Sequence, residues 1–377
     1  MPSRDVLIVT PSGRNLGGSE VMLGQFLASA ERHGITARVV FLEGGDHYDE
    51  IRAAGYSCEL LGAGRLRQPV NWLKVNATLA GILRRHLPSV LIGWQAKAAA
   101  YSALPAALAG VPFFCFHRGL PGRGTVDRIS FLLPCQGYLA NSHFTAEKLR
   151  VHTRRPIAVV HSCVDLQRFD AARRTPAPEM RERLGFDPRR PLVGIVGRLQ
   201  HWKGMHVFLE AMETIVREYP GCQGVVVGGS YGLEPDYPAF LDEQLAARNL
   251  RETVRMAGAQ RNVPDWMQAM DVVVHASAQE PFGLVVVEAM SLGKPVIATV
   301  PGGPREVVTH ETSGLLVPEG DARALADAIG RLLSDAALAK RLGQEAAQTA
   351  LHHDGFRYAP RVLDAIAGIH SVRAQRR

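Results

Sequence analysis

Short apolar runs alternate with helix-length segments along almost the whole chain, and this alternation limits the fold more than any other feature. The segment 19–33 is typical of the intervening helices, because its apolar residues recur at helical spacing. Strands that alternate with helices predict parallel sheets with crossover helices, the α/β class. The expected strands are 5–10, 36–42, 57–61, 89–94, 112–116, 136–140 and 156–161, then 191–197, 223–228, 253–257, 271–276, 295–299 and 314–317.

The alternation stops at 171–190, where two proline clusters predict an interdomain linker. A length of 377 residues also favours two domains. We therefore expect one domain over 1–170, a second over 191–354, and a last helix within 355–377. Both domains are predicted to be doubly wound, and ligands of such sheets bind beyond the carboxyl ends of the strands. The cleft between the two domains is the expected site.

The segment 279–290 is the richest in chemical groups and reads Gln-Glu-Pro-Phe-Gly-Leu-Val-Val-Val-Glu-Ala-Met. Glu280 falls in a strand-to-helix loop and Glu288 in the following helix, about 12 Å further along its axis. That separation fits a paired glycosidase acid and base poorly, and it fits two separate hydroxyl-binding carboxylates better. The amides of Gly283 and Leu284, at the helix start, would suit an anion.

Two glycine-containing loops could hold a phosphate. After the predicted strand 191–197 come Arg198 and Lys203, a fork of donors and a point charge that suit a diphosphate. After the strand 5–10, the loop from Asn15 to Glu20 contains Gly17 and Gly18, which let a ligand approach the backbone. Its spacing matches neither the dinucleotide fingerprint nor a P-loop.

His117 ends the predicted strand 112–116, where it could hydrogen-bond a substrate hydroxyl near the reacting carbon. No Asp-x-Asp occurs, so a metal–diphosphate clamp has no obvious ligands, and we expect no metal. No cofactor is expected either. The five cysteines are scattered without a CxxC pair, which favours a reducing, cytoplasmic compartment.

Taken together, these segments resemble the retaining glycosyltransferases of family 4, which have the GT-B fold of two Rossmann-like domains facing across a cleft. The resemblance covers nearly the whole chain. It rests on Gly17-Gly-Ser-Glu, Gly197-Arg-Leu with Lys203-Gly, Val227-Gly-Gly, Glu280-Pro-Phe-Gly-Leu with Glu288, and Pro301-Gly-Gly with Glu306 and Gly314-Leu-Leu-Val-Pro. One departure is Ser162-Cys-Val-Asp, where family members usually have Asn-Gly-Val-Asp; this leaves the hinge geometry open.

The resemblance implies a nucleoside-diphosphate-sugar donor held by the second domain and a hydroxyl acceptor held by the first, which could be a glycan, a lipid-linked molecule or a small molecule. A UDP-sugar is favoured over a GDP-sugar, and the transferred group would be hexosyl or N-acetylhexosaminyl. The implied transfer is retaining and metal-independent, and the last helix would return to the first domain. The implied catalytic residues are His117, Arg198, Lys203 and Glu280. The implied donor-binding residues are Arg198 and Lys203 at the diphosphate, Glu280 at the sugar, Glu288 at the ribose, Arg261 and Val263 at the base, and Gly17, Gly18, Phe282, Gly283 and Leu284.

Charge is uneven along the chain. Residues 51–130 hold 10 basic and 2 acidic side chains, a net charge of +8, against +7 for the whole chain. This favours either an anionic membrane surface, with a lipid-linked acceptor, or an ordinary solvated surface and a soluble acceptor. Nucleic acid is not expected, because aromatic residues make up only 7% of the chain. The basic residues named for the membrane hypothesis are Arg65, Arg67, Lys74, Arg84, Arg85 and Lys97.

Two other functions remain open at this point. A nucleotide-sugar epimerase and a non-catalytic nucleotide-sugar-binding protein could both be built on the same fold. Product analysis would separate them from a transferase.

Overall fold

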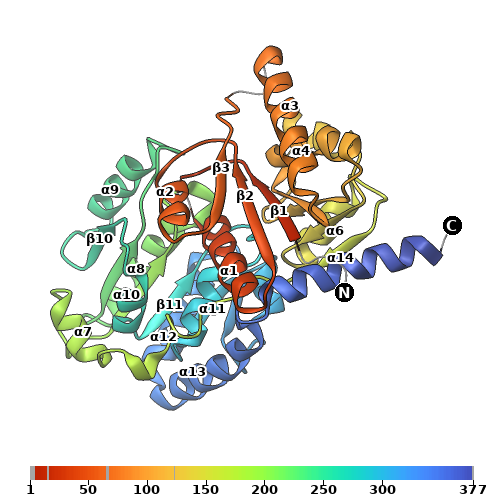
Figure 1. Cartoon of the computed structure of the whole chain (residues 1–377). Helices are drawn as coiled ribbons and strands as arrows, with labels where there is room; N and C mark the ends of the chain where they lie inside the picture. The colour runs from red at the N-terminus through yellow and green to blue at the C-terminus, as the bar shows by residue number, and fades with distance from the viewer. Residues whose placement is uncertain (1–4, 15–16, 65–67, 123, 376–377) are drawn as a thin grey trace. The chain divides into compact units, whose positions relative to one another are not determined.

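The computed structural model describes residues 5–14, 17–64, 68–122 and 124–375 (Figure 1). The chain divides into two compact units. Unit 1 comprises Met1–Cys163 and Gly355–Arg377, and unit 2 comprises Val164–Asp354. Each unit contains one parallel sheet and the helices that connect its strands. The predicted α/β class is therefore confirmed.

Unit 1 is a parallel sheet of seven strands in the order β3-β2-β1-β4-β5-β6-β7. The order reverses between β1 and β4, so the helices after these strands leave in opposite directions. The strands are β1 (Asp5–Thr10), β2 (Thr36–Phe41), β3 (Ser57–Leu60), β4 (Val90–Trp94), β5 (Phe113–His117), β6 (Gly137–Ala140) and β7 (Ile157–Val159). The helices are α1 (Gly18–Arg32), α2 (Asp46–Ala53), α3 (Pro69–His86), α4 (Ala96–Ala109), α5 (Thr125–Leu132), α6 (His143–Arg150) and α14 (Tyr358–Gln375).

The last helix, α14, belongs to unit 1 and packs against α1, β6 and β7. Two hydrogen bonds hold the start of α14 and the residues just before it against the rest of unit 1. Ser29 Oγ donates to the carbonyl of Phe356 at 2.7 Å, and Arg118 Nη1 donates to the Tyr358 hydroxyl at 2.7 Å. Tyr358 is fully buried and meets Phe26 edge to face.

Unit 2 is a parallel sheet of six strands in the order β10-β9-β8-β11-β12-β13, which reverses between β8 and β11. The strands are β8 (Leu192–Val196), β9 (Gln223–Val227), β10 (Val254–Gly258), β11 (Val272–His275), β12 (Val296–Val300) and β13 (Leu315–Pro318). The helices are α7 (Ala177–Arg183), α8 (Met205–Glu218), α9 (Tyr237–Ala247), α10 (Val263–Ala269), α11 (Leu284–Ser291), α12 (Ala322–Ser334) and α13 (Ala336–Ala350), with short 3-10 turns η1 (Ala171–Arg173), η2 (His201–Lys203), η3 (Gly303–Glu306) and η4 (Leu351–His353).

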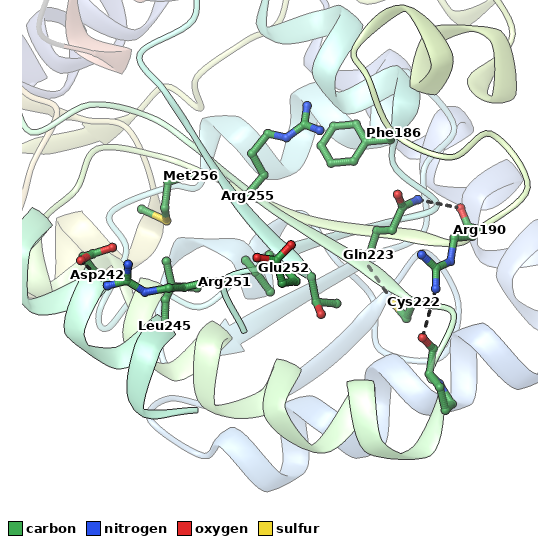
Figure 2. A pocket seen from close by; sticks show the side chains of 13 residues that line it. Phe186, Arg190, Cys222, Gln223, Asp242, Leu245, Arg251, Glu252, Arg255 and Met256 are labelled. Atoms are coloured by element: carbon green, nitrogen blue, oxygen red, sulfur yellow. Dashed lines mark hydrogen bonds and ion pairs between the residues drawn. The ribbon is translucent and has the colours of Figure 1, made fainter. Parts of the chain in front are cut away.

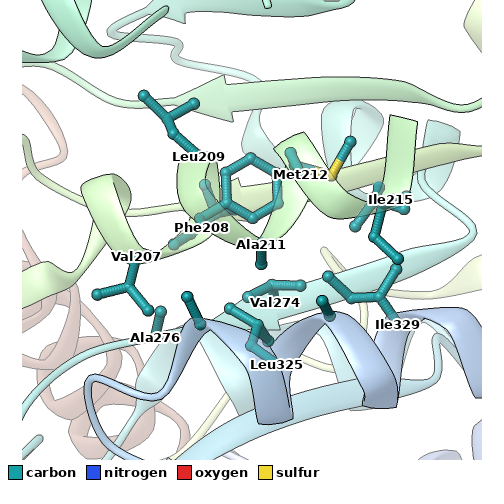
Figure 3. Packing of buried hydrophobic residues seen from close by; sticks show 14 of the residues in the cluster. Val207, Phe208, Leu209, Ala211, Met212, Ile215, Val274, Ala276, Leu325 and Ile329 are labelled. Atoms are coloured by element: carbon teal, nitrogen blue, oxygen red, sulfur yellow. The ribbon is translucent and has the colours of Figure 1, made fainter. Parts of the chain in front are cut away.

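Apolar packing on one face of this sheet joins α8 to α12 (Figure 3). Phe208 and Met212 of α8 are fully buried with Ile329 of α12 and Val274 of β11. The central strands β8 and β11 are buried on both faces, which explains why their sequences are continuous apolar runs rather than alternating ones.

The segment 171–190 differs from its predicted role as a linker, because it is folded into unit 2. It forms η1 and α7, and it buries Met180 and Phe186 in the unit 2 core. Arg181 is also buried, and its guanidinium reaches Asp271 Oδ1 at 2.7 Å. Prolines 176 and 178 precede or open α7, where a missing backbone N–H costs nothing, so the proline cluster marks a helix start.

Helix α3 has Arg84 and Arg85 in its last turn, and its apolar residues are not all in the core. Val75, Leu79 and Leu83 are buried against α4, which lies beside α3 (Figure 1). Val70 and Leu73 are 65% and 59% exposed. Arg65 and Arg67 lie outside the described residues. Within the described part of the chain, no helix is both long and apolar enough to cross a membrane.

Candidate functional site

The loops after β8 and β11 meet at the point where the strand order of unit 2 reverses. β8 and β11 are hydrogen-bonded neighbours, so their carboxyl ends lie side by side. The Trp202 carbonyl, in the first loop, accepts from the amide of Ala278 in the second at 2.7 Å. Gly204 permits this contact, because a Cβ there would lie 2.1 Å from the carbonyl oxygen of Ala276. Parallel sheets bind their ligands at such reversals.

Glu280 is held by two donors from these elements. Lys203 Nζ lies 2.6 Å from Oε2 of Glu280, and the side chains are only 15% and 11% exposed. His275 Nε2 lies 3.2 Å from the same oxygen. Burial alone would raise the pKa of Glu280, but Lys203 and His275 hold it well below its usual range. Glu280 is therefore an ionised, nearly buried carboxylate.

Lys203 and Glu280, each predicted as a site residue, are thus brought together, whereas His275 was not among the predicted site residues. His275 is the last residue of β11 and is 4% exposed. Its only sequence signal is its place at the carboxyl end of a strand next to the reversal, five positions before Glu280. A chain with 14 histidines gives that signal little weight.

Other groups suited to anion binding lie on the same two loops. Arg198 is partly buried, and its guanidinium makes no hydrogen bond or ion pair with any other described residue. Gly283 precedes α11 with a φ of +91°, and α11 starts at Leu284. The amides of Gly283 and Leu284 therefore lie at a helix start, which favours negative charge. The Phe282 side chain is buried in the core, so it supports the loop from within.

Glu288 lies on α11 and is partly buried. Burial raises the pKa of Glu288 to about 7, against a smaller opposing effect of the positive charge of Arg168. Arg168 Nη2 also lies 3.3 Å from the carbonyl oxygen of Arg261. The Arg261 side chain is exposed, and Val263 begins α10. Arg168 therefore connects the predicted ribose carboxylate with the loop predicted to hold the base.

Unit 1 has a comparable arrangement where its strand order reverses between β1 and β4. Gly17 precedes α1 with a φ of +152°, Gly18 is its first residue, and Asn15 lies outside the described residues. Two side chains at the end of β4 bind the start of α1. Trp94 Nε1 donates to the Ser19 carbonyl at 3.2 Å, and Gln95 Nε2 donates to Ser19 Oγ at 2.5 Å.

His117 ends β5 as predicted, and it is 3% exposed. Its ring stacks on Phe131 at a centroid distance of 5.6 Å and is tilted against Tyr138. Burial, with a smaller effect of His152, lowers the pKa of His117 to about 4. His117 is therefore neutral near pH 7, and its Nε2 has no partner among the described residues.

A pocket of about 500 Å³ lies elsewhere in unit 2 (Figure 2). Cys222 and Gln223, at the start of β9, line it together with Val254, at the start of β10. It therefore opens at the amino ends of the strands, the edge opposite Glu280. Its arginines already have partners, since Arg251 pairs with Asp242 and Arg255 stacks on Phe186. The pocket adds nothing to the candidate site.

Family models match both units. Residues 176–349 match the model described as glycosyl transferases group 1, and residues 16–168 match the model described as Glycosyltransferase Family 4. The D-inositol 3-phosphate glycosyltransferase of Corynebacterium urealyticum is 38% identical over 48% of this chain and 43% of its own length. The lipopolysaccharide core biosynthesis mannosyltransferase LpsB of Rhizobium meliloti is 33% identical over 52% of this chain and 55% of its own. The chain spans about half the length of the curated relatives it matches.

Solved structures resemble the chain over nearly its full length. Anabaena HepE, crystallised with UDP and glucose, matches with a TM-score of 0.86 and 24% identity, covering 96% of this chain and 99% of HepE. A glycosyltransferase from Rickettsia africae matches with a TM-score of 0.87 and 20% identity, covering 98% and 99%. These matches confirm the predicted GT-B fold.

Proposed function

This chain belongs to glycosyltransferase family 4, and on that premise we propose that it is a retaining glycosyltransferase with a nucleoside-diphosphate-sugar donor and a hydroxyl acceptor. The group transferred is hexosyl or N-acetylhexosaminyl. A UDP-sugar is favoured over a GDP-sugar as the donor, and the UDP and UDP-glucose complexes of HepE support that choice. The reaction needs no metal and no cofactor.

The ionised Glu280 is the observation that carries this proposal. Both donors that hold it bind Oε2, and no described residue donates to Oε1. A carboxylate with one occupied and one open oxygen suits the hydroxyls of a sugar. Arg198 and Lys203, together with the amides of Gly283 and Leu284, supply positive charge for the diphosphate.

In the proposed step, the acceptor hydroxyl oxygen bonds to the anomeric carbon on the same face from which the diphosphate leaves. The bond from that carbon to the diphosphate oxygen breaks, and the acceptor proton moves to a phosphate oxygen of the leaving group. The chain's own residues then have to stabilise the growing charge on the diphosphate, which is the role of Arg198 and Lys203.

Further contacts are with the nucleoside of the donor sugar: Glu288 binds the ribose, and the loop of Arg261 and Val263 holds the base. Phe282 supports the donor loop from the core, and Gly17 and Gly18 allow close backbone approach. His117 hydrogen-bonds a sugar hydroxyl as a neutral imidazole. His117 is already surrounded by aromatic rings that fix its orientation.

The acceptor is a lipid-linked molecule reached at the cytoplasmic face of an anionic membrane, and unit 1 makes the membrane contact. The exposed Val70 and Leu73 on α3 support this, because a pair of apolar side chains beside Lys74 could enter a lipid headgroup layer. A soluble acceptor is the alternative outcome of the flotation test given below.

A ligand panel tests the proposed function. Thermal unfolding is measured with UDP-, GDP-, ADP- and TDP-sugars, because a ligand of the folded state raises its stability by mass action. We expect the largest rise with a UDP-sugar. Product analysis then separates three outcomes: a new glycoside supports the transferase, an isomerised donor identifies an epimerase, and binding without turnover with any acceptor identifies a binding protein.

A further inference from the structure

We infer that His275 is a positioning residue that determines which oxygen of Glu280 is presented to the donor sugar. This inference deepens the proposed function and rests on it. His275 is not expected to contact the sugar or the diphosphate itself. Its effect passes through the carboxylate of Glu280.

The position of His275 on a central strand makes it a rigid partner. β11 lies between β8 and β12 in the sheet, and His275 is paired in register with Ala298 of β12. Its ring is 96% buried, as its relative exposure of 4% indicates. Lys203, in contrast, carries its charge on a flexible stem, and an ammonium can hold either oxygen of a carboxylate. The ring of His275 therefore restricts the orientation of the carboxylate more than the ammonium of Lys203 does.

The proton that joins His275 to Glu280 must be on Nε2. A carboxylate is an acceptor only, so a bare Nε2 would set two acceptors 3.2 Å apart. His275 Nδ1 is buried and has no hydrogen-bond partner among the described residues. A proton on Nδ1 as well would therefore be a buried donor without an acceptor. Nε2 is thus the nitrogen that donates to Oε2.

The backbone around Glu280 is held in one conformation. Gln279 has a φ of +49°, and the Glu280 carbonyl accepts from the amide of Gly303 at 2.8 Å. A Cβ on Gly303 would lie 2.3 Å from the Pro281 carbonyl oxygen, so only glycine allows this approach. With Oε2 bonded to Lys203 and His275, Oε1 is left with its lone pairs available to hydroxyl groups of a sugar.

Two substitutions separate the role of His275 as a hydrogen-bond donor from a role as a ring that only fills space. His275→Leu keeps an apolar group of moderate size and removes the donor, whereas His275→Gln keeps an N–H near the position of Nε2. We expect kcat with UDP-glucose, or with whichever donor sugar the panel identifies, to fall about 100-fold in His275→Leu, since misplaced catalytic groups cost rates of this order. His275→Gln should recover at least a tenth of the wild-type kcat.

Binding of the nucleotide alone is the readout that a general structural defect would change. UDP lacks the sugar that Glu280 holds, so its Kd should stay within about twofold of the wild-type value in both variants. Ile215→Val serves as the matched control. Ile215 is a fully buried core residue in the last turns of α8, at the edge of the sheet opposite the site, and its truncation should lower the thermal midpoint without changing kcat.

A nitrogen NMR spectrum of the histidine rings tests the same inference without any substrate. His275 should show a protonated Nε2 and an unprotonated Nδ1, assigned by its loss in His275→Gln. A proton on Nδ1 instead, a wild-type kcat in His275→Leu, or equal losses in a stable His275→Gln and His275→Leu would each overturn the inference. Failure of the wild-type protein to bind UDP or turn over any donor would instead overturn the proposed function.

Discussion

Lys203 and Glu280 form a nearly buried ion pair at 2.6 Å although 77 positions separate them in the sequence. Each had been assigned to a different part of the donor, the diphosphate for Lys203 and the sugar for Glu280. Their contact means that the two assignments are not independent. A change at one residue alters the charge and the freedom of the other.

A double-mutant cycle on this pair should separate stability from catalysis. Glu280→Gln or Lys203→Met alone leaves one charge buried without its partner, and we expect a loss of about 3 kcal/mol in unfolding free energy. The double variant should recover most of that loss, and all three should lose at least about 100-fold in kcat. Chemical denaturation and initial rates provide the two measurements. Recovery of activity in the double variant would contradict the assigned roles.

The raised pKa of Glu288 predicts a pH-dependent donor affinity. A ribose hydroxyl donates to the ionised carboxylate, and with a pKa of about 7 only a tenth of the population is ionised at about pH 6. The Kd for the nucleoside diphosphate should therefore be about tenfold weaker at pH 6 than at pH 8. Calorimetry at both values measures it. Glu288→Gln should bind more weakly and show little pH dependence, and a pH-dependent Glu288→Gln would remove the assignment.

The same group should make the free protein less stable as the pH rises. Its folded-state pKa of about 7 lies above the ordinary glutamate pKa of 4.5, so the folded state binds the proton more tightly. This contribution to stability is complete below about pH 4.5 and is lost as the pH rises through about 7. Glu288→Gln should therefore unfold at a higher temperature than the wild type at pH 8, with a smaller difference at pH 5. An unchanged difference across this range would show that Glu288 has an ordinary pKa.

Transfer should proceed in excess EDTA and with retention at the anomeric carbon. The chain has no Asp-x-Asp, Lys203 lies against Glu280, and Arg198 lies on the same loop as Lys203. Activity is compared with and without EDTA, and the product linkage is assigned by NMR. A strict requirement for Mg²⁺ or Mn²⁺, or an inverted product, would be incompatible with the proposed step.

Contact with an anionic membrane should depend on the exposed end of α3. Flotation with vesicles of anionic lipid at low salt should recover the wild type and much less of Leu73→Ser, whereas neutral vesicles should recover neither. Leu108→Ser is the matched control, because Leu108 of α4 is 64% exposed and its helix has Lys97 as its one basic residue. Equal flotation of both variants would exclude α3 as the contact. No flotation of the wild type would contradict the membrane contact and support a soluble acceptor.

Gly204→Ala should cost more stability than its backbone angle alone explains. Gly204 and Gly232 have nearly the same φ, +71° and +70°, so alanine at either position carries a comparable backbone strain of about 1 kcal/mol. A Cβ at Gly232 meets nothing within 4 Å, whereas one at Gly204 meets the Ala276 carbonyl. The difference between the two variants in denaturant unfolding measures this contact. Equal losses would show that the loops after β8 and β11 separate easily.

The sequence was sufficient to predict most of the fold, because strands buried on both faces are continuous apolar runs with helical segments between them. The error at 171–190 came from reading proline only as a helix breaker, although Pro176 and Pro178 lie where a helix begins. Val70 and Leu73 are exposed although Trp72, which lies between them, donates to the Ala100 carbonyl of α4, so the two apolar residues lie on another face of α3. Apolar residues can predict a helix without showing which of them face its neighbour.

The candidate site was predictable wherever a residue follows a strand in a recognisable motif. The pairing of Lys203 with Glu280 was not, since it depends on which strands are neighbours, and β8 and β11 are far apart in the chain. His275 was missed for the same reason. Its role follows from a hydrogen bond between a strand end and a loop, which no spacing in the sequence specifies.

The return of α14 to unit 1 has a consequence for the order in which a nascent chain acquires its structure. A ribosome delivers residues 5–163 first, then the whole of unit 2, and only afterwards the helix that covers Phe26 and Ser29 of α1. Domains generally fold as units during synthesis. Unit 2 can therefore fold completely while unit 1 still exposes the apolar surface of α1, so the first part to be made is the last to be finished.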